Sequence, residues 1–105
     1  MLKFEWDEHK NQSNKIKHSI SFEKAKEVFE EDNAIEFKGN PTSELRILRI
    51  GKTLSKILIA VVYTMRSTAI RIISARSASK KETKSYLKNS LSKQAQDESE
   101  HREGD

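Results

Sequence analysis

Five arginines lie in the middle of the chain, in a segment almost free of acidic residues: Arg46, Arg49, Arg66, Arg71 and Arg76. Residues 46–91 carry eleven Lys or Arg and one Asp or Glu, a net charge of +10 that the +4 of the whole chain hides. A guanidinium group is planar and permanently charged, so it can bind a phosphate through two hydrogen bonds and stabilise charge that develops in phosphoryl transfer. The pattern therefore predicts a localised site for a phosphate-rich partner.

Structural ion pairs are the alternative for any one of these arginines. Arg46 could pair with Glu44, and Arg71 with Glu36, across neighbouring strands. This alternative fits single arginines better than the whole segment, because Glu82 is the only acidic residue between positions 46 and 91.

Histidine and tyrosine supply the few other groups that could do chemistry. The three histidines are far apart in the sequence and lack metal-ligand spacing, so neither a metal site nor a cofactor is predicted. His18 stands at the expected end of a helix, where it either interacts with the helix C-terminus or acts as a general base. Tyr86 is either a packed aromatic residue or a catalytic hydroxyl. Cysteine is absent, which excludes disulfides and thiolate nucleophiles.

The N-terminal third must position these groups with one strand and two helices. Residues 2–6 alternate as in a strand, and Asp7 can cap a polar helix over residues 8–18. Ile16 is the only aliphatic anchor of that helix, so we expect it to be thinly attached to the core. Ser21 caps a second, amphipathic helix that stops near residues 31–33. The acidic cluster Glu30, Glu31 and Asp32 is at the wrong end for the helix dipole, which indicates fraying or an outside use.

The remaining residues predict strands and one more helix. Apolar runs joined by short turns indicate antiparallel strands over residues 34–38, 45–50, 55–64 and 69–75. A helix follows, from Ser77 or Ser79 to about Leu91. The expected class is α+β: an antiparallel sheet of about four strands with two N-terminal helices and one C-terminal helix, forming a single domain over residues 1–91. Residues 92–105 contain no large apolar side chain and predict a disordered polar tail.

Hairpin register brings the basic residues together on one face of this sheet. Because side chains alternate along a strand, even-numbered residues share a half-exposed face, with Arg46, Ala60 and Ser74 roughly in one row. Ile70 and Ile72 would lie on this even face and Arg71 on the odd, core-facing one. Arg66 and Arg76 would lie about six residues, or ~20 Å, apart along the strands. A single β-bulge would exchange the faces beyond it.

Composition bears on where the protein works. Hydrophobic and charged residues each make up 34% of the sequence. The longest apolar run, residues 57–63, is far short of the ~18 residues that a membrane span needs. Residues 1–7 do not form an apolar leader, so a cytoplasmic protein is expected.

Several ordered motifs resemble one family of bacterial proteins. They are FEWDEHK (residues 4–10), KHSISFEKA (17–25), ELR (44–46), VVYTMR (61–66) and IRIISARSA (70–78), together with Asn14, Phe29, Gly51, Glu82 and Tyr86. This set resembles the BrnT family of toxins from type II toxin-antitoxin systems. Two positions depart from the family pattern: Ser19 replaces a usual glycine, and Leu45 replaces a usual acidic residue.

The resemblance implies a RelE-like fold and a ribonuclease that cleaves RNA without a metal, by activating a 2′-hydroxyl against the adjacent phosphate, and so inhibits translation. It also implies a BrnA-like antitoxin that neutralises the toxin in a 2:2 heterotetramer and alone contacts operator DNA.

Site residues follow from the same resemblance, together with the basic segment. Arg46, Arg66 and Arg76 would bind the phosphate or stabilise the transition state. Glu44 or His18 would accept a proton, and Tyr86 resembles the helix tyrosine of related toxins. The residues expected to bind RNA are Arg66, Arg71, Ser74, Lys80 and Lys81. Two other functions compete: a nucleic-acid-binding module without catalysis, and an interaction subunit whose basic face holds an acidic antitoxin segment.

Overall fold

The computed structural model describes residues 2–39 and 44–103, with side chains up to Lys93. Its strands are β1 (Lys3–Glu5), β2 (Ile35–Lys38), β3 (Ile47–Lys52), β4 (Leu58–Arg66) and β5 (Ala69–Ser77). Its helices are α1 (Glu8–His18), α2 (Phe22–Ala25), the 3-10 helix η1 (Lys26–Glu30) and α3 (Lys80–Glu103). The α+β class is confirmed.

The sheet has five strands in the order β1-β5-β4-β3-β2. Strands β2 to β5 pair antiparallel, as predicted, but β1 joins β5 in parallel. The four antiparallel strands are as predicted, but the expected sheet of about four strands is wrong, because β1 adds a fifth, parallel strand. The sequence indicates β1 but not its partner: Phe4 and Trp6 pack against the core that β5 helps to form, which holds β1 at this edge.

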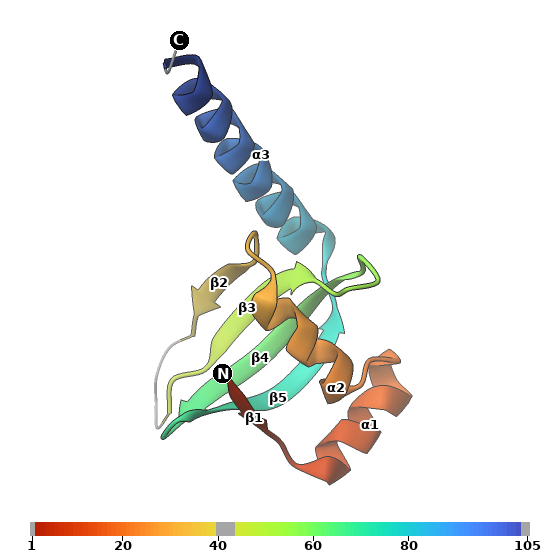
Figure 1. The fold of residues 1–105 in the computed structure, drawn as a ribbon. Helices are drawn as coiled ribbons and strands as arrows, with labels where there is room; N and C mark the ends of the chain where they lie inside the picture. Colours follow the sequence, from red (N-terminus) through yellow and green to blue (C-terminus); the bar gives the residue numbers. More distant parts are fainter. Residues whose placement is uncertain (1, 40–43, 104–105) are drawn as a thin grey trace.

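Helices α1, α2 and η1 cover one face of the sheet, which we call the helix-bearing face (Figure 1). The main core lies beneath them and includes Phe22, Val28, Ile59, Val61 and Ile72. The opposite face, which we call the open face, is covered in part by the start of α3, where Tyr86 packs against Ile50 and Ala60. Beyond this contact α3 projects away from the sheet (Figure 1).

Buried asparagines, and not an aliphatic side chain, attach α1 to the fold. Ile16 is 86% exposed, so the expected anchor is wrong. Asn14 instead donates its amide to the carbonyls of Ile20 and Ala75, both at 2.8 Å, and accepts from the Ala75 amide at 3.2 Å. Asn11 accepts from the Phe22 amide at 2.8 Å. Satisfied amides can be buried at low cost, which explains how a polar helix docks firmly.

The acidic cluster after η1 also has a structural use. The Glu31 carboxylate accepts a hydrogen bond from the Lys52 amide at 3.0 Å and another from the Tyr86 hydroxyl. These bonds keep the pKa of Glu31 below its usual value, although desolvation opposes them. Glu31 therefore connects η1 to β3 and α3, and the expectation of fraying or an outside use does not hold for this residue.

Helix α3 is longer than the sequence pattern indicates. It runs to Glu103, whereas an end near Leu91 was expected. Residues 92–103 contain neither Gly nor Pro, and seven of the twelve are Glu, Gln, Lys or Ala, which favour helix. Residues 92–103, expected to belong to a disordered tail, thus have a helical backbone. The domain boundary at residue 91 stays a prediction.

Candidate nucleic-acid interface

Strand register arranges the open face in three rows. The first, Ile35, Ile50, Ala60 and Arg76, lies beneath α3. The second is Phe37, Leu48, Val62 and Ser74. The third contains Arg46, two residues before Leu48, and the cross-strand pair Thr64 and Arg71. An apolar middle row is therefore flanked by rows that carry arginine.

This pattern corrects the predicted row of Arg46, Ala60 and Ser74. Ala60 lies opposite Ile50 and Arg76, while Ser74 lies opposite Val62. The three residues share the predicted face, but the hairpins pair with a different offset. The offset could not be predicted from the turn residues, because neither turn contains a strong two-residue hairpin sequence such as Asn-Gly.

A β-bulge corrects the faces of β5. Val62 pairs with Ser74, but the next residue, Tyr63, pairs with Ile72. Because this pairing skips Ile73, the residues before the bulge have the opposite orientation to the prediction. Ile70 and Ile72 are buried in the helix-bearing core, and Arg71 lies on the open face.

Arg76 is held in a fixed orientation by Glu82. The guanidinium donates to both carboxylate oxygens of Glu82, at 2.7 and 2.8 Å. The side chain of Arg76 is 42% exposed, so the same group is also open to a ligand. The pair lowers the pKa of Glu82 to about 2 and raises that of Arg76. Glu82 is thus a site residue that sequence reasoning did not assign.

A capping box places this pair at the start of α3. The Ser79 hydroxyl accepts from the Glu82 amide at 3.1 Å, and the Glu82 carboxylate accepts from the Ser79 amide at 2.8 Å. This reciprocal pattern, Ser-x-x-Glu, is a common helix N-terminus. The signal is visible in the sequence, but the additional bond to Arg76 depends on the position of β5.

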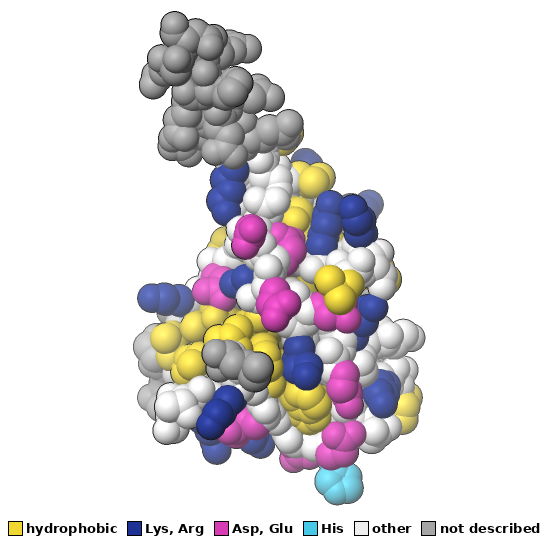
Figure 2. All heavy atoms as spheres, in the orientation of Figure 1, with side chains coloured by type: hydrophobic (Ala, Val, Ile, Leu, Met, Phe, Trp, Pro, Cys, Tyr) yellow, Lys and Arg dark blue, Asp and Glu magenta, His cyan; other side chains and the backbone are white. Residues whose placement is uncertain are grey.

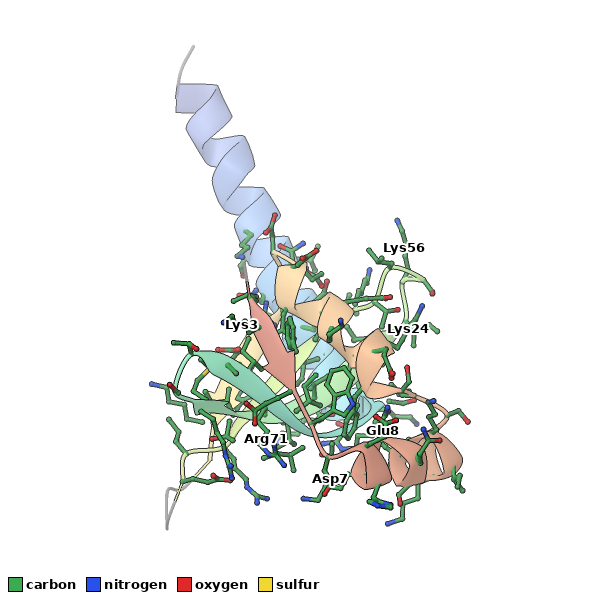
Figure 3. The ribbon with its side chains drawn as sticks, turned by 60° about the horizontal axis from the view of Figure 1, so that its bottom comes forward. Lys3, Asp7, Glu8, Lys24, Lys56 and Arg71 are labelled. Carbon is green, nitrogen blue, oxygen red and sulfur yellow. The ribbon has the colours of Figure 1, made fainter. Side chains whose placement is uncertain are left out.

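The other predicted phosphate ligands lie at the far end of the open face. Arg46 makes a long ion pair with Glu44, at 3.7 Å, as the structural alternative predicted. Arg71 pairs with Glu5 of β1 at 2.8 Å, and not with Glu36 as that alternative assumed. Figure 3 labels Arg71 beside β1 and β5. Arg66 ends β4 six residues after the partner of Arg76, so the predicted separation of these two arginines is confirmed.

Arg49 and Glu36 belong to the helix-bearing face. Arg49 donates to the carbonyl of Val28 at 2.8 Å and to Glu36 at 3.0 Å. Burial raises the pKa of Tyr63, and the hydrogen bond that its hydroxyl donates to Glu36 raises it further. Arg49 therefore serves the fold and lies away from the open face.

Two shallow hollows of about 280 Å³ each open on the middle row. The first is lined by Phe37, Leu48, Val62 and Arg46, among others. The second is lined by Phe37 and Leu48 and by Lys81, Glu82 and Ser85 of α3. The surface between the arginine rows is therefore a trough with an apolar floor and cationic ends. Lys80 and Lys81 are exposed at its α3 end, and Ser74 is half-buried at the end of the middle row.

Two predicted catalytic residues lie outside this trough. His18 is exposed at the end of α1, which packs on the helix-bearing face. Tyr86 is buried beneath α3, and its hydroxyl is donated to Glu31. Burial, together with this carboxylate, raises the pKa of Tyr86 to about 12. The structure thus brings Arg46 and Glu44 together but leaves His18 and Tyr86 apart from them.

The helix-bearing side has a different character. Figure 2, seen from this side, shows acidic and basic side chains interspersed. It also holds a hollow of about 480 Å³ between the α1–α2 connection and the β3–β4 turn, lined by Lys15, Lys24 and Ile57, among others. None of the predicted site residues lines this hollow.

The described part of the chain carries neither a membrane-spanning helix nor a cluster of metal ligands. Within residues 2–39 and 44–103, no helix is both long and apolar enough to span a bilayer. Among the residues that the structure describes, no group of three or more His, Asp or Glu side chains could hold a metal ion.

Comparison with known proteins identifies a family. The profile of the family described as "Ribonuclease toxin, BrnT, of type II toxin-antitoxin system" matches residues 6–82. The chain belongs to the BrnT family. The match includes β2 to β5 and ends at Glu82, three residues into α3. The predicted family is therefore confirmed.

A solved structure gives the same result. The 1.1 Å crystal structure of the ribonuclease toxin BrnT from Brucella abortus is similar to this chain, with a TM-score of 0.60. The sequences are 31% identical, and the match covers 76% of this chain and 100% of that chain. The comparison with curated proteins finds no match. The match with the BrnT structure supports a toxin of a toxin-antitoxin system, whereas membership of the RelE-like group stays a prediction.

Proposed function

We propose that the open face binds one strand of RNA and cleaves it without a metal ion, as an endoribonuclease that inhibits translation. The observation that carries this proposal is the trough itself: an apolar row between two rows that present Arg46, Arg71 and Arg76. RNA binding needs cations for the phosphates and an apolar surface for unstacked bases. Both occur together here, in a family whose described activity is that of a ribonuclease toxin.

Within this proposal, Arg76 binds a phosphate next to the bond that is cleaved, oriented by Glu82. Arg46 neutralises charge on the phosphorane as it forms. Glu44 lies beside Arg46 and accepts the proton of the attacking 2′-hydroxyl. The 2′ oxygen then bonds to phosphorus and the 5′ oxygen leaves with a proton from water. Roles for His18 and Tyr86 stay predictions, because neither lies in the trough.

The flanking cations hold the rest of the strand. Arg66 and Arg71 would bind phosphates at one end of the trough, and Lys80 and Lys81 at the other. Ser74 would donate a hydrogen bond at the end of the middle row. Because Arg66 and Arg76 are about six residues, or ~20 Å, apart, they bind different phosphates.

A BrnA-like antitoxin would neutralise the protein by competing for the cationic surface around the trough. The proposed assembly is a 2:2 heterotetramer that contacts operator DNA only through the antitoxin. This part of the proposal rests on the family, which belongs to toxin-antitoxin systems.

Incubation of the antitoxin-free protein with naked RNA, with and without a chelator, tests the activity. We expect cleavage that persists in the chelator, is lost in Arg46→Ala and Arg76→Ala, and is retained in Lys17→Ala. Lys17 is a matched control because it is an exposed cation on α1. Chelator-sensitive cleavage would contradict the metal-free mechanism. Intact RNA bound with a steep salt dependence would instead identify a binding module without catalysis.

Growth inhibition by the expressed protein provides a second test. Arg46→Ala and Arg76→Ala should each relieve inhibition while the purified variants keep wild-type circular dichroism. Full toxicity of both variants would refute the assigned site.

A further inference from the structure

Phe37 stands out because its aromatic ring is left exposed on the open face. It is the only exposed aromatic side chain among the described residues, with 47% of its surface accessible. The other six aromatic residues of the chain are buried or half-buried. The exposed part of the ring contributes little to the stability of the fold and is open to a ligand.

Phe37 lies between two hollows of the open face, and we call its exposed ring the platform. It lies opposite Leu48 at the β2 end of the middle row, and it lines both hollows of about 280 Å³. It also lines a third, of about 370 Å³, between β2 and α3. A flat ligand could therefore reach the ring from these hollows.

Cations border this platform on both sides. Arg46 lines one hollow and Lys81 the other. The carboxylates nearby already have partners, since Glu82 holds Arg76 and Glu44 pairs with Arg46. The chemistry that fits is a flat, unsaturated ring system joined to negative charge on both sides.

We propose that Phe37 stacks against an unpaired base of the RNA strand, with the flanking phosphates directed toward Arg46 and Lys81. The inference rests on the proposed function, because it assumes that the open face binds RNA. Stacking on an aromatic ring is a sequence-tolerant contact that single-stranded RNA makes with sheet surfaces. Phe37 is then a positioning residue: it fixes which phosphate lies beside Arg46.

The test uses a 2′-O-methyl oligoribonucleotide, which cannot be cleaved through a 2′-hydroxyl, with one 2-aminopurine as a fluorescent base. Its dissociation constant and its fluorescence are measured with the full chain and with Phe37→Ala, Phe37→Leu and Phe37→Trp. The control is Leu54→Ala, because Leu54 is an apolar residue, 80% exposed, outside the open face.

Removal of the ring should weaken binding by about fivefold to 150-fold in both Phe37→Ala and Phe37→Leu, the range measured for a base-aromatic stack. The dependence of log Kd on log salt should keep its slope, because no cation is lost. Phe37→Trp should bind at least as tightly as the wild type, and the wild-type protein should quench the 2-aminopurine. Leu54→Ala should bind as the wild type does.

Wild-type affinity in Phe37→Ala would overturn the inference and leave the proposed function standing. Wild-type affinity in Phe37→Leu would also overturn it, because the contact would then need only an apolar side chain. If Phe37→Ala binds RNA normally but binds the antitoxin weakly, the surface belongs to the protein partner and the base site is refuted. A wild-type protein that binds no oligonucleotide refutes the inference and the proposed function together.

Discussion

Replacement of Asn14 by alanine should destabilise the protein strongly, because this side chain attaches α1 to the sheet. The side chain is 7% exposed and makes three hydrogen bonds that connect α1 to Ile20 and to both backbone groups of Ala75. Each bond contributes about 1 kcal/mol, and alanine also leaves the Ala75 amide buried without a partner, so we expect a loss of about 3 kcal/mol. For a domain of this size the midpoint of thermal unfolding should fall by about 15 °C.

Urea unfolding followed by circular dichroism and by the fluorescence of Trp6, the only tryptophan, measures this loss. Ile16→Ala is the matched control on the same helix, and at 86% exposure it should change the free energy of unfolding by less than about 0.5 kcal/mol. Asn14→Asp should cost as much as alanine at pH 7, because a carboxylate would face two carbonyls, and should recover stability as acid protonates it. A loss below about 0.5 kcal/mol in Asn14→Ala would refute the assignment of α1's attachment to this side chain.

Three further changes test other contacts. Glu82→Gln should cost about 1–2 kcal/mol at pH 7, discounted for the exposure of Arg76. Because the folded pKa of Glu82, about 2, lies below the ordinary value of 4.5, the difference from wild type in urea unfolding should persist above about pH 5 and disappear as pH falls toward 2. Tyr86→Phe should cost about 1–2 kcal/mol, and a double-mutant cycle with Glu31→Gln should show non-additivity, since the two side chains share a hydrogen bond. Gly51→Ala should cost about 1–3 kcal/mol in thermal unfolding, because the new Cβ would lie 3.1 and 3.2 Å from two neighbouring Cβ atoms.

Local patterns in the sequence predicted most elements of the fold. Helix caps at Asp7 and Ser21 and the apolar runs of the strands give the elements close to their observed positions. These signals are short-range, so each is contained in the residues that form the element. The parallel partner of β1 is different, because it depends on a contact between segments more than sixty residues apart.

Local patterns likewise predict only part of the candidate site. Alternation along each strand correctly places Arg46 and Arg76 on one face, but not their neighbours across the sheet. Neighbours depend on hairpin offset and on the bulge at Ile73, and a shift of one residue there reverses Arg71. Alternation can therefore predict which side chains share a surface along an unbroken strand, whereas the faces beyond a bulge and the rows across the sheet require the three-dimensional register.

The contact between Arg76 and Glu82 depends both on a local sequence signal and on the arrangement of the sheet. Glu82 belongs to a local helix cap, and the same carboxylate fixes a guanidinium from β5. A change in Glu82 must therefore affect both the start of α3 and the orientation of the phosphate ligand, whereas loss of the Ser79 hydroxyl affects only the cap. If RNA binding depends on a preoriented Arg76, a change in Glu82 should alter the affinity for RNA, whereas a change in Ser79 should not. Helix stability should respond to both, so the two roles of one carboxylate can be separated by comparing these residues.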